Sequence, residues 1–76
     1  MDVEKIAQKL GTAQTRVILS LSLGWGPSGD NAAAKRIWYR GDIPRLIDHK
    51  HRTDDCWCLT QTGLAVRAYL KDQAND

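Results

Sequence analysis

The fold is decided by one stretch in the second half of the chain, Leu46-Ile47-Asp48-His49-Lys50-His51-Arg52-Thr53-Asp54-Asp55-Cys56-Trp57-Cys58-Leu59. Its two ends, residues 46–51 and 56–59, are short runs of the length and composition typical of strands. Between them lie the four polar residues 52–55, which favour a turn. The stretch therefore predicts a two-stranded β-hairpin. A hairpin of this size cannot bury an apolar face alone, so we expect it to pack against helices.

Helical patterns lie on both sides of this hairpin. Apolar residues at helical spacing predict helices over residues 2–10 and 13–22, although residues 17–23 also alternate partly like a strand. Asp30 is a good N-cap for a helix over residues 31–40. After the hairpin, Leu64 to Leu70 predict a C-terminal helix capped by Thr60 or Thr62, and residues 71–76 are expected to fray. The order is helix, helix, helix, hairpin, helix, which is an α+β arrangement.

Length and composition limit what the chain can be. With 76 residues it is expected to form a single domain, residues 1–76, and it is too short for a TIM barrel or a full dinucleotide fold. Apolar residues make up 42% and charged residues 26%, an ordinary globular balance. No apolar run is long enough for a membrane span. The N-terminal segment carries Asp2 and Glu4 and does not resemble a signal peptide, so we expect a cytoplasmic protein.

Positive charge is concentrated in the middle of the chain. The formal net charge is only +2. Residues 35–52 nevertheless contain six basic residues against Asp42 and Asp48, whereas the segments on either side are neutral or acidic. Local basic clusters of this kind are typical of surfaces that bind polyanions. If the chain has a nucleic-acid surface, we expect it here.

One short motif carries a resemblance to a known family. Leu59-Thr60-Gln61-Thr62-Gly63 leads from the second strand into a helix, and Leu46-Ile47 forms an apolar pair at the start of the first strand. Over residues 30–70 this pattern resembles winged-helix DNA-binding domains of the multidrug-resistance-regulator type. The resemblance implies a small winged-helix-like domain with three helices, a two-stranded wing and a C-terminal helix. Segments 35–41, 46–51 and 56–60 also resemble small uncharacterised phage or prophage proteins, which implies a bacterial host cytoplasm.

The sequence departs from that family at one place. A full winged helix has a positioning helix and a recognition helix before the wing. Between Gly24 and Leu46 there is room for one clear helix and a turn at Asp42-Ile43-Pro44. Either residues 13–22 serve as the positioning helix, or the core is abbreviated.

The candidate DNA contacts lie on helix 31–40 and on the wing, residues 46–59. Lys and Arg bind phosphates or guanine edges, and Asn near a helix start can read bases. The candidates are Asn31, Lys35, Arg36, Arg40, Arg45, Lys50, His51 and Arg52. The plainer interpretation is a solvated helix and an exposed polar turn. Asp54 and Asp55 at the turn would repel phosphate.

Two histidines and two cysteines on the hairpin raise the question of zinc. If residue 49 pairs with 58 and residue 51 with 56, then His49, His51, Cys56 and Cys58 share one face and form a zinc-like ligand set. A slip of one residue sends the two pairs to opposite faces. If Ile47 and Leu59 both face the core, the slipped register holds. We therefore expect free thiols and no metal or other cofactor.

Two classes of function remain after these considerations. The first is duplex DNA binding by a phage-type transcriptional regulator, acting as a homodimer because one small module buries limited DNA surface. The second is a phage-encoded inhibitor or adaptor that binds a host protein or defence complex without DNA. We expect no enzyme activity, because the sequence has no defensible nucleophile triad or carboxylate pair.

Overall fold

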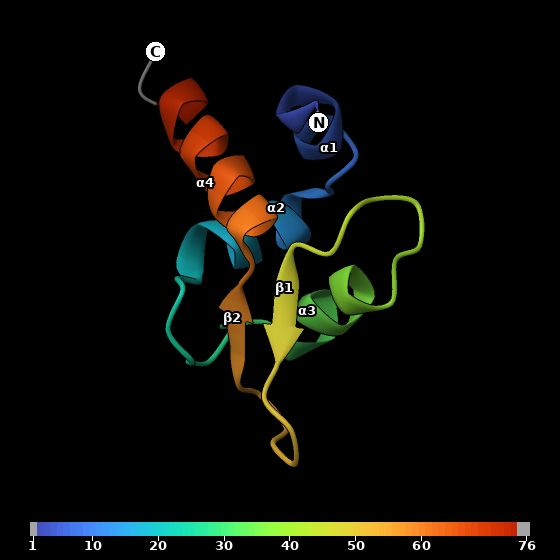
Figure 1. The fold of residues 1–76 in the computed structure, drawn as a ribbon, viewed down its shortest axis with the longest axis vertical. Helices are drawn as coiled ribbons and strands as arrows, with labels where there is room; N and C mark the ends of the chain where they lie inside the picture. The colour runs from blue at the N-terminus through green and yellow to red at the C-terminus, as the bar shows by residue number, and fades with distance from the viewer. Residues whose placement is uncertain (1, 75–76) are drawn as a thin grey trace.

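The computed structural model describes residues 2–74 (Figure 1). Its elements are, in chain order, α1 (Val3–Gln8), α2 (Thr12–Ser20), α3 (Asn31–Trp38), β1 (Ile47–His49), β2 (Trp57–Leu59) and α4 (Gln61–Ala74). The strands form a two-stranded antiparallel sheet. The α+β class and the predicted order of elements are thus confirmed. In Figure 1, α1 and α4 lie together at one end of the molecule, and the turn of the hairpin projects from the other.

Short-range capping interactions fix where the helices begin. The carboxylate of Asp2 accepts a hydrogen bond from the Lys5 backbone N–H at 3.2 Å and caps α1. Asp30 caps α3 in the same way, at 3.1 Å from the Ala33 N–H, as the sequence predicts. These side chains satisfy backbone donors that have no partner within the helix.

The core is formed where α2, α3 and α4 meet the hairpin. Thirteen buried apolar residues form one cluster: Ile6, Ala7, Val17, Ile18, Leu21, Ala33, Ala34, Ile37, Leu46, Ile47, Trp57, Leu59 and Val66. Ala33 and Ala34 bring little side-chain volume, so α3 can pack closely against α2 and β1. Trp57 is the largest fully buried side chain, so the hairpin contributes substantially to the core of this small chain.

The Leu59–Gly63 motif joins the hairpin to α4 through several backbone contacts. Thr60 is the residue that caps α4, since its hydroxyl accepts the Gly63 backbone N–H at 3.0 Å. The same hydroxyl donates to the Arg45 carbonyl at 2.7 Å, and the Thr60 N–H donates to the Leu46 carbonyl at 3.0 Å. A Cβ atom on Gly63 would overlap the Leu46 carbonyl. The motif is therefore a close junction between the start of β1 and the start of α4.

The loop between α2 and α3 lies along the free side of β2. Gly26 and Trp57 exchange two backbone hydrogen bonds of 2.9 and 2.8 Å, and the Leu59 N–H donates to the Ser22 carbonyl at 2.7 Å. These bonds satisfy β2 groups that would otherwise be unpaired at the sheet edge. Residues 22–26 thus extend the sheet without forming a full strand.

Most expected boundaries differ from the observed ones by one or more residues. The helices expected over 2–10 and 13–22 are observed as Val3–Gln8 and Thr12–Ser20, the strands expected over 46–51 and 56–59 as Ile47–His49 and Trp57–Leu59, and α4 begins at Gln61, before Leu64. The helix predicted over 31–40 ends at Trp38, because Tyr39 leaves helical geometry and Arg40 turns to pair with Asp42. Residues 71–74, expected to fray, continue α4, whose side chains Tyr69 and Leu70 pack against the core. Residues 75 and 76 of the expected frayed tail lie outside the described part of the chain.

The connection from α3 to β1 contains no second helix. Residues 39–46, all of which the structure describes, form turns, bends and irregular chain. α3 is therefore the last helix before the hairpin, and α2 packs directly against it.

Candidate nucleic-acid interface

The hairpin register separates the histidines from the cysteines. Ile47 pairs with Leu59, Asp48 with Cys58, and His49 with Trp57, which is the slipped register. His49 and Cys58 therefore point to opposite faces of the sheet. Burial, with a smaller contribution from Asp48, raises the pKa of the Cys58 thiol, which disfavours a thiolate ligand. Within residues 2–74, no three His, Cys, Asp or Glu side chains gather as a metal site.

The inner face of the hairpin carries an aromatic cluster against α3. The His49 ring lies 4.3 Å from the Trp57 ring, and Trp38 meets both rings edge-on at 6.1–6.3 Å. The Arg45 guanidinium lies 4.0 Å from the centre of the Trp38 ring. Such a contact holds a cation over an aromatic face. Arg45, a candidate DNA contact, is thus stacked on the protein itself.

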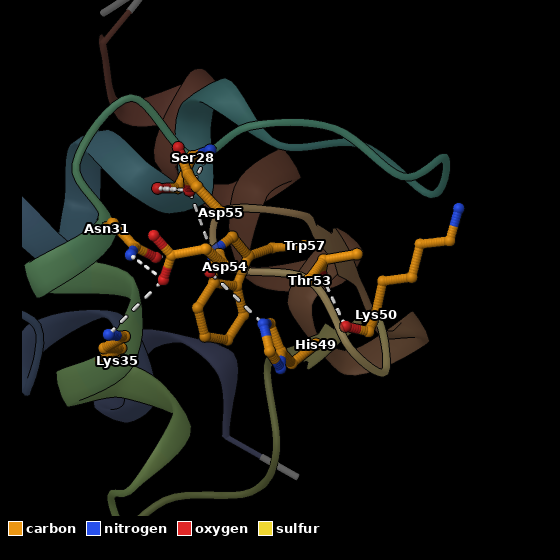
Figure 2. Close-up of polar contacts among 9 residues, drawn as sticks. All are labelled: Ser28, Asn31, Lys35, His49, Lys50, Thr53, Asp54, Asp55 and Trp57. Carbon is orange, nitrogen blue, oxygen red and sulfur yellow. Dashed lines mark hydrogen bonds and ion pairs between the residues drawn. The ribbon is translucent and has the colours of Figure 1, made fainter.

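The acidic residues beside the hairpin turn point toward α3 (Figure 2). One carboxylate oxygen of Asp54 accepts the Asn31 side-chain amide at 3.3 Å and lies 3.8 Å from the Lys35 ammonium. The Asn31 carbonyl oxygen accepts the Trp57 indole N–H at 3.1 Å. Asn31 and Lys35, both candidate DNA contacts, are therefore engaged with the hairpin.

Asp55 connects the hairpin to the loop that precedes α3. One of its oxygens accepts three hydrogen bonds: from the Ser28 hydroxyl at 2.7 Å, the Ser28 N–H at 3.1 Å and the Trp57 indole at 3.1 Å. Ser28 is buried in the loop that precedes α3. These donors, first of all the Ser28 hydroxyl, lower the pKa of Asp55 below its ordinary value. The carboxylate thus holds the hairpin in place.

We expect Asp55→Ala to lower the free energy of unfolding by about 1–3 kcal/mol, because it leaves the buried Ser28 without its acceptor. Asp54→Ala removes the same charge from a side chain that is 88% exposed and is expected to change the free energy by less than about 1 kcal/mol. Urea unfolding of both variants at pH 7 measures the difference. Equal losses of stability in the two variants would contradict the interpretation that the Asp55 carboxylate holds the hairpin in place.

The stability difference between wild type and Asp55→Ala should also depend on pH. The pKa of the Asp55 carboxylate is lowered in the folded state. Its ionised form therefore adds to the free energy of unfolding above the ordinary aspartate pKa of 3.8, and this stabilisation is lost as pH falls below that value. The stability difference between wild type and Asp55→Ala should therefore narrow between pH 5 and the acid limit.

The turn of the hairpin itself presents only basic side chains and a threonine. The Thr53 N–H and hydroxyl donate to the Lys50 carbonyl at 3.2 and 2.6 Å and close a tight turn. His51 and Arg52 occupy its two central positions and are exposed. Arg52 has a φ of 64°, in the left-handed region that favours glycine. We call Lys50, His51 and Arg52 the tip. The Lys50 side chain points away from Asp54 and its partners Asn31 and Lys35 (Figure 2).

Arg40 lies in a different environment from the other candidates. Its guanidinium forms two hydrogen bonds with Asp42, at 2.7 and 3.0 Å, and donates to the Lys9 carbonyl and the Gln14 side chain at 2.8 and 2.9 Å. The Arg40 hydrogen bonds lower the pKa of Asp42 to about 2. Arg40 therefore joins the end of α1 and the start of α2 to the chain after α3, and only 20% of its side chain is exposed.

Tyr39 is exposed beside the basic residues of α3 but is missing from the sequence-based candidates. Lys35, Arg36 and Tyr39 follow helical spacing at and just after the end of α3 and are all exposed, Tyr39 to 80%. We call these three residues the α3 face. Tyr39 lies one turn after Lys35 and Arg36, and this spacing is the signal that could have found it.

Comparisons of the chain with protein-family models, curated proteins and solved structures find no match. In the described part of the chain, no helix has the length and apolar character to cross a membrane. No matching family or relative therefore assigns a function to this surface.

Proposed function

We propose that the protein binds duplex DNA through the tip and the α3 face, as a small winged-helix-like regulator of the phage or prophage type. The observation that carries this proposal is the arrangement of charge at the hairpin turn. Asp54 and Asp55 bond to α3 and its preceding loop, and the tip projects with Lys50, His51 and Arg52 exposed. Asp55 is thus bonded away from the tip, and the exposed carboxylate of Asp54 faces Asn31 and Lys35.

The geometry suits contact with a phosphate backbone. Arg36, Lys50 and Arg52 have no carboxylate partner among the described residues, so their charges are available to a polyanion. The tight turn fixes the backbone of the tip before binding, which reduces the entropy lost on association. Lysine and arginine contacts to phosphate supply most of the affinity of non-specific DNA binding. Because the interface is small, we propose that two copies bind together.

A protein partner is the second candidate, and the exposed apolar residues favour it. Leu23 and Trp25, on the loop beside β2, are 52% and 51% exposed. Tyr39 on the α3 face is more exposed still. Large aromatic side chains on a surface are typical of protein interfaces. An inhibitor or adaptor acting on a host or defence complex would use these residues and would not need duplex DNA.

Salt dependence of binding tests the proposal. If three to five phosphates are contacted, affinity for a 20-base-pair duplex should fall by about 40- to 500-fold between 50 and 200 mM salt. Fluorescence anisotropy with labelled duplex measures this. Absence of binding at 50 mM salt would contradict the proposal and favour a protein partner, which a pull-down from host lysate would then identify.

A further inference from the structure

Four of the five candidate side chains on α3 and in the connection after it, all except Arg36, are already engaged inside the protein. Bases are identified in the major groove chiefly by two-point hydrogen bonds from Asn, Gln, Arg or Lys. Asn31 is the only amide on α3, and both of its polar atoms are occupied, by Asp54 and by the Trp57 indole. Freeing Asn31 would leave the indole N–H of the buried Trp57 with Asp55 as its only acceptor.

The candidate arginines near α3 are constrained in the same way. Arg40 makes four hydrogen bonds that join three segments of the chain, and Arg45 is stacked on Trp38. Lys35 faces Asp54. Of the basic candidates on α3 and in the connection after it, only Arg36 has no such contact among the described residues.

The backbone of α3 and of the connection after it also disfavours base reading. A major groove accepts a helix that presents several side chains along one face. The residues between Tyr39 and Leu46 form no helix, and α3 has only eight residues, three of which are buried in the core. The free basic residues among the candidate DNA contacts are therefore split between one position on α3 and the tip of the hairpin.

We infer that this surface binds the phosphate backbone of duplex DNA and selects no fixed base sequence. The inference rests on the proposed DNA binding and specifies its substrate class: duplex DNA of any sequence. A regulator of this kind would act by occupying or shaping DNA rather than by recognising an operator. Contacts from Arg36, Lys50 and Arg52 would then be contacts to phosphate, which carry no sequence information.

A selection from a randomised duplex pool tests this inference with the full-length protein. After several rounds at 100 mM salt, the recovered duplexes should show no consensus. Anisotropy titrations on individual recovered duplexes should then agree within about fivefold. One two-point base contact alone changes affinity by about five- to 150-fold, so a consensus with larger differences would overturn the inference while leaving DNA binding intact. A chain that binds no duplex would instead refute the proposed function, and the inference with it.

A conservative substitution gives an independent measurement. Arg36→Lys and Arg52→Lys keep the charge and remove the planar two-point donor. If both residues contact phosphate, each variant should bind every duplex within about threefold of wild type. A larger loss on some duplexes than on others would show base reading and overturn the inference. Thermal unfolding of both variants checks that the fold is unchanged.

Discussion

Replacing Gly63 with alanine is expected to lower the free energy of unfolding by at least about 3 kcal/mol, a large part of the stability of a chain this short. The added methyl group would overlap the Leu46 backbone carbonyl, which also accepts the Thr60 N–H. Because the obstacle is backbone, no side-chain rotation can relieve it. The start of β1 and the start of α4 would have to separate, and circular dichroism during urea unfolding would report the loss.

Gly41→Ala is the matched control for this experiment. Gly41 lies in the connection after α3, has no atom within 4 Å of an added Cβ, and does not have a positive φ. The substitution should change stability by less than about 1 kcal/mol and can raise it, because alanine restricts the unfolded chain. A Gly63→Ala variant as stable as Gly41→Ala would contradict the close-junction interpretation.

Reversing two charges on the proposed DNA surface should have the largest effect on binding. The double variant Arg36→Glu/Arg52→Glu replaces two attractive contacts by two repulsive ones, and we expect its affinity for duplex to fall by about 100-fold or more at 100 mM salt. The slope of log affinity against log salt should become shallower by about two, one for each lost phosphate contact. Neither side chain is buried or ion-paired among the described residues, so the fold should persist.

Lys5→Glu with Lys71→Glu provides the control at equal net charge. Lys5 is exposed on α1 and Lys71 is exposed near the end of α4, and both helices lie away from the tip (Figure 1). If binding depends on the tip and the α3 face, this variant should lose at most about tenfold, through long-range electrostatics alone. Equal losses in the two double variants would mean that only the total charge matters, and the proposed surface would be wrong.

The sequence was sufficient for the elements but not for the contacts between them. The hairpin follows from the polar turn between two short strand-like runs. Its register was predicted only on the condition that Ile47 and Leu59 both face the core, and the structure meets that condition. Asp30 could be assigned as a cap, and the cap of α4 narrowed to Thr60 or Thr62, because capping acts over three residues. These are local rules, and they apply whatever the rest of the chain does.

The contacts that shape the candidate site are long-range, and no local pattern predicts them. Asp55 bonds to Ser28, 27 residues earlier, and Arg40 bonds to Lys9 and Gln14, 31 and 26 residues earlier. Charge alone made Arg40 a candidate for DNA and made Asp54 and Asp55 obstacles to phosphate. Whether a charge is available depends on its partner in the folded chain. The sequence located the basic region but could not tell its free groups from its engaged ones.

The left-handed backbone of Arg52 has a consequence for protein engineering. Such a conformation costs an arginine about 1–2 kcal/mol that a glycine would not lose. A library screened for heat resistance alone would therefore favour glycine at residue 52 and would discard a cation at the tip. A library screened for retention on immobilised duplex should keep the arginine in spite of the strain. Position 52 is thus where optimisation for durability and optimisation for DNA capture lead to different sequences.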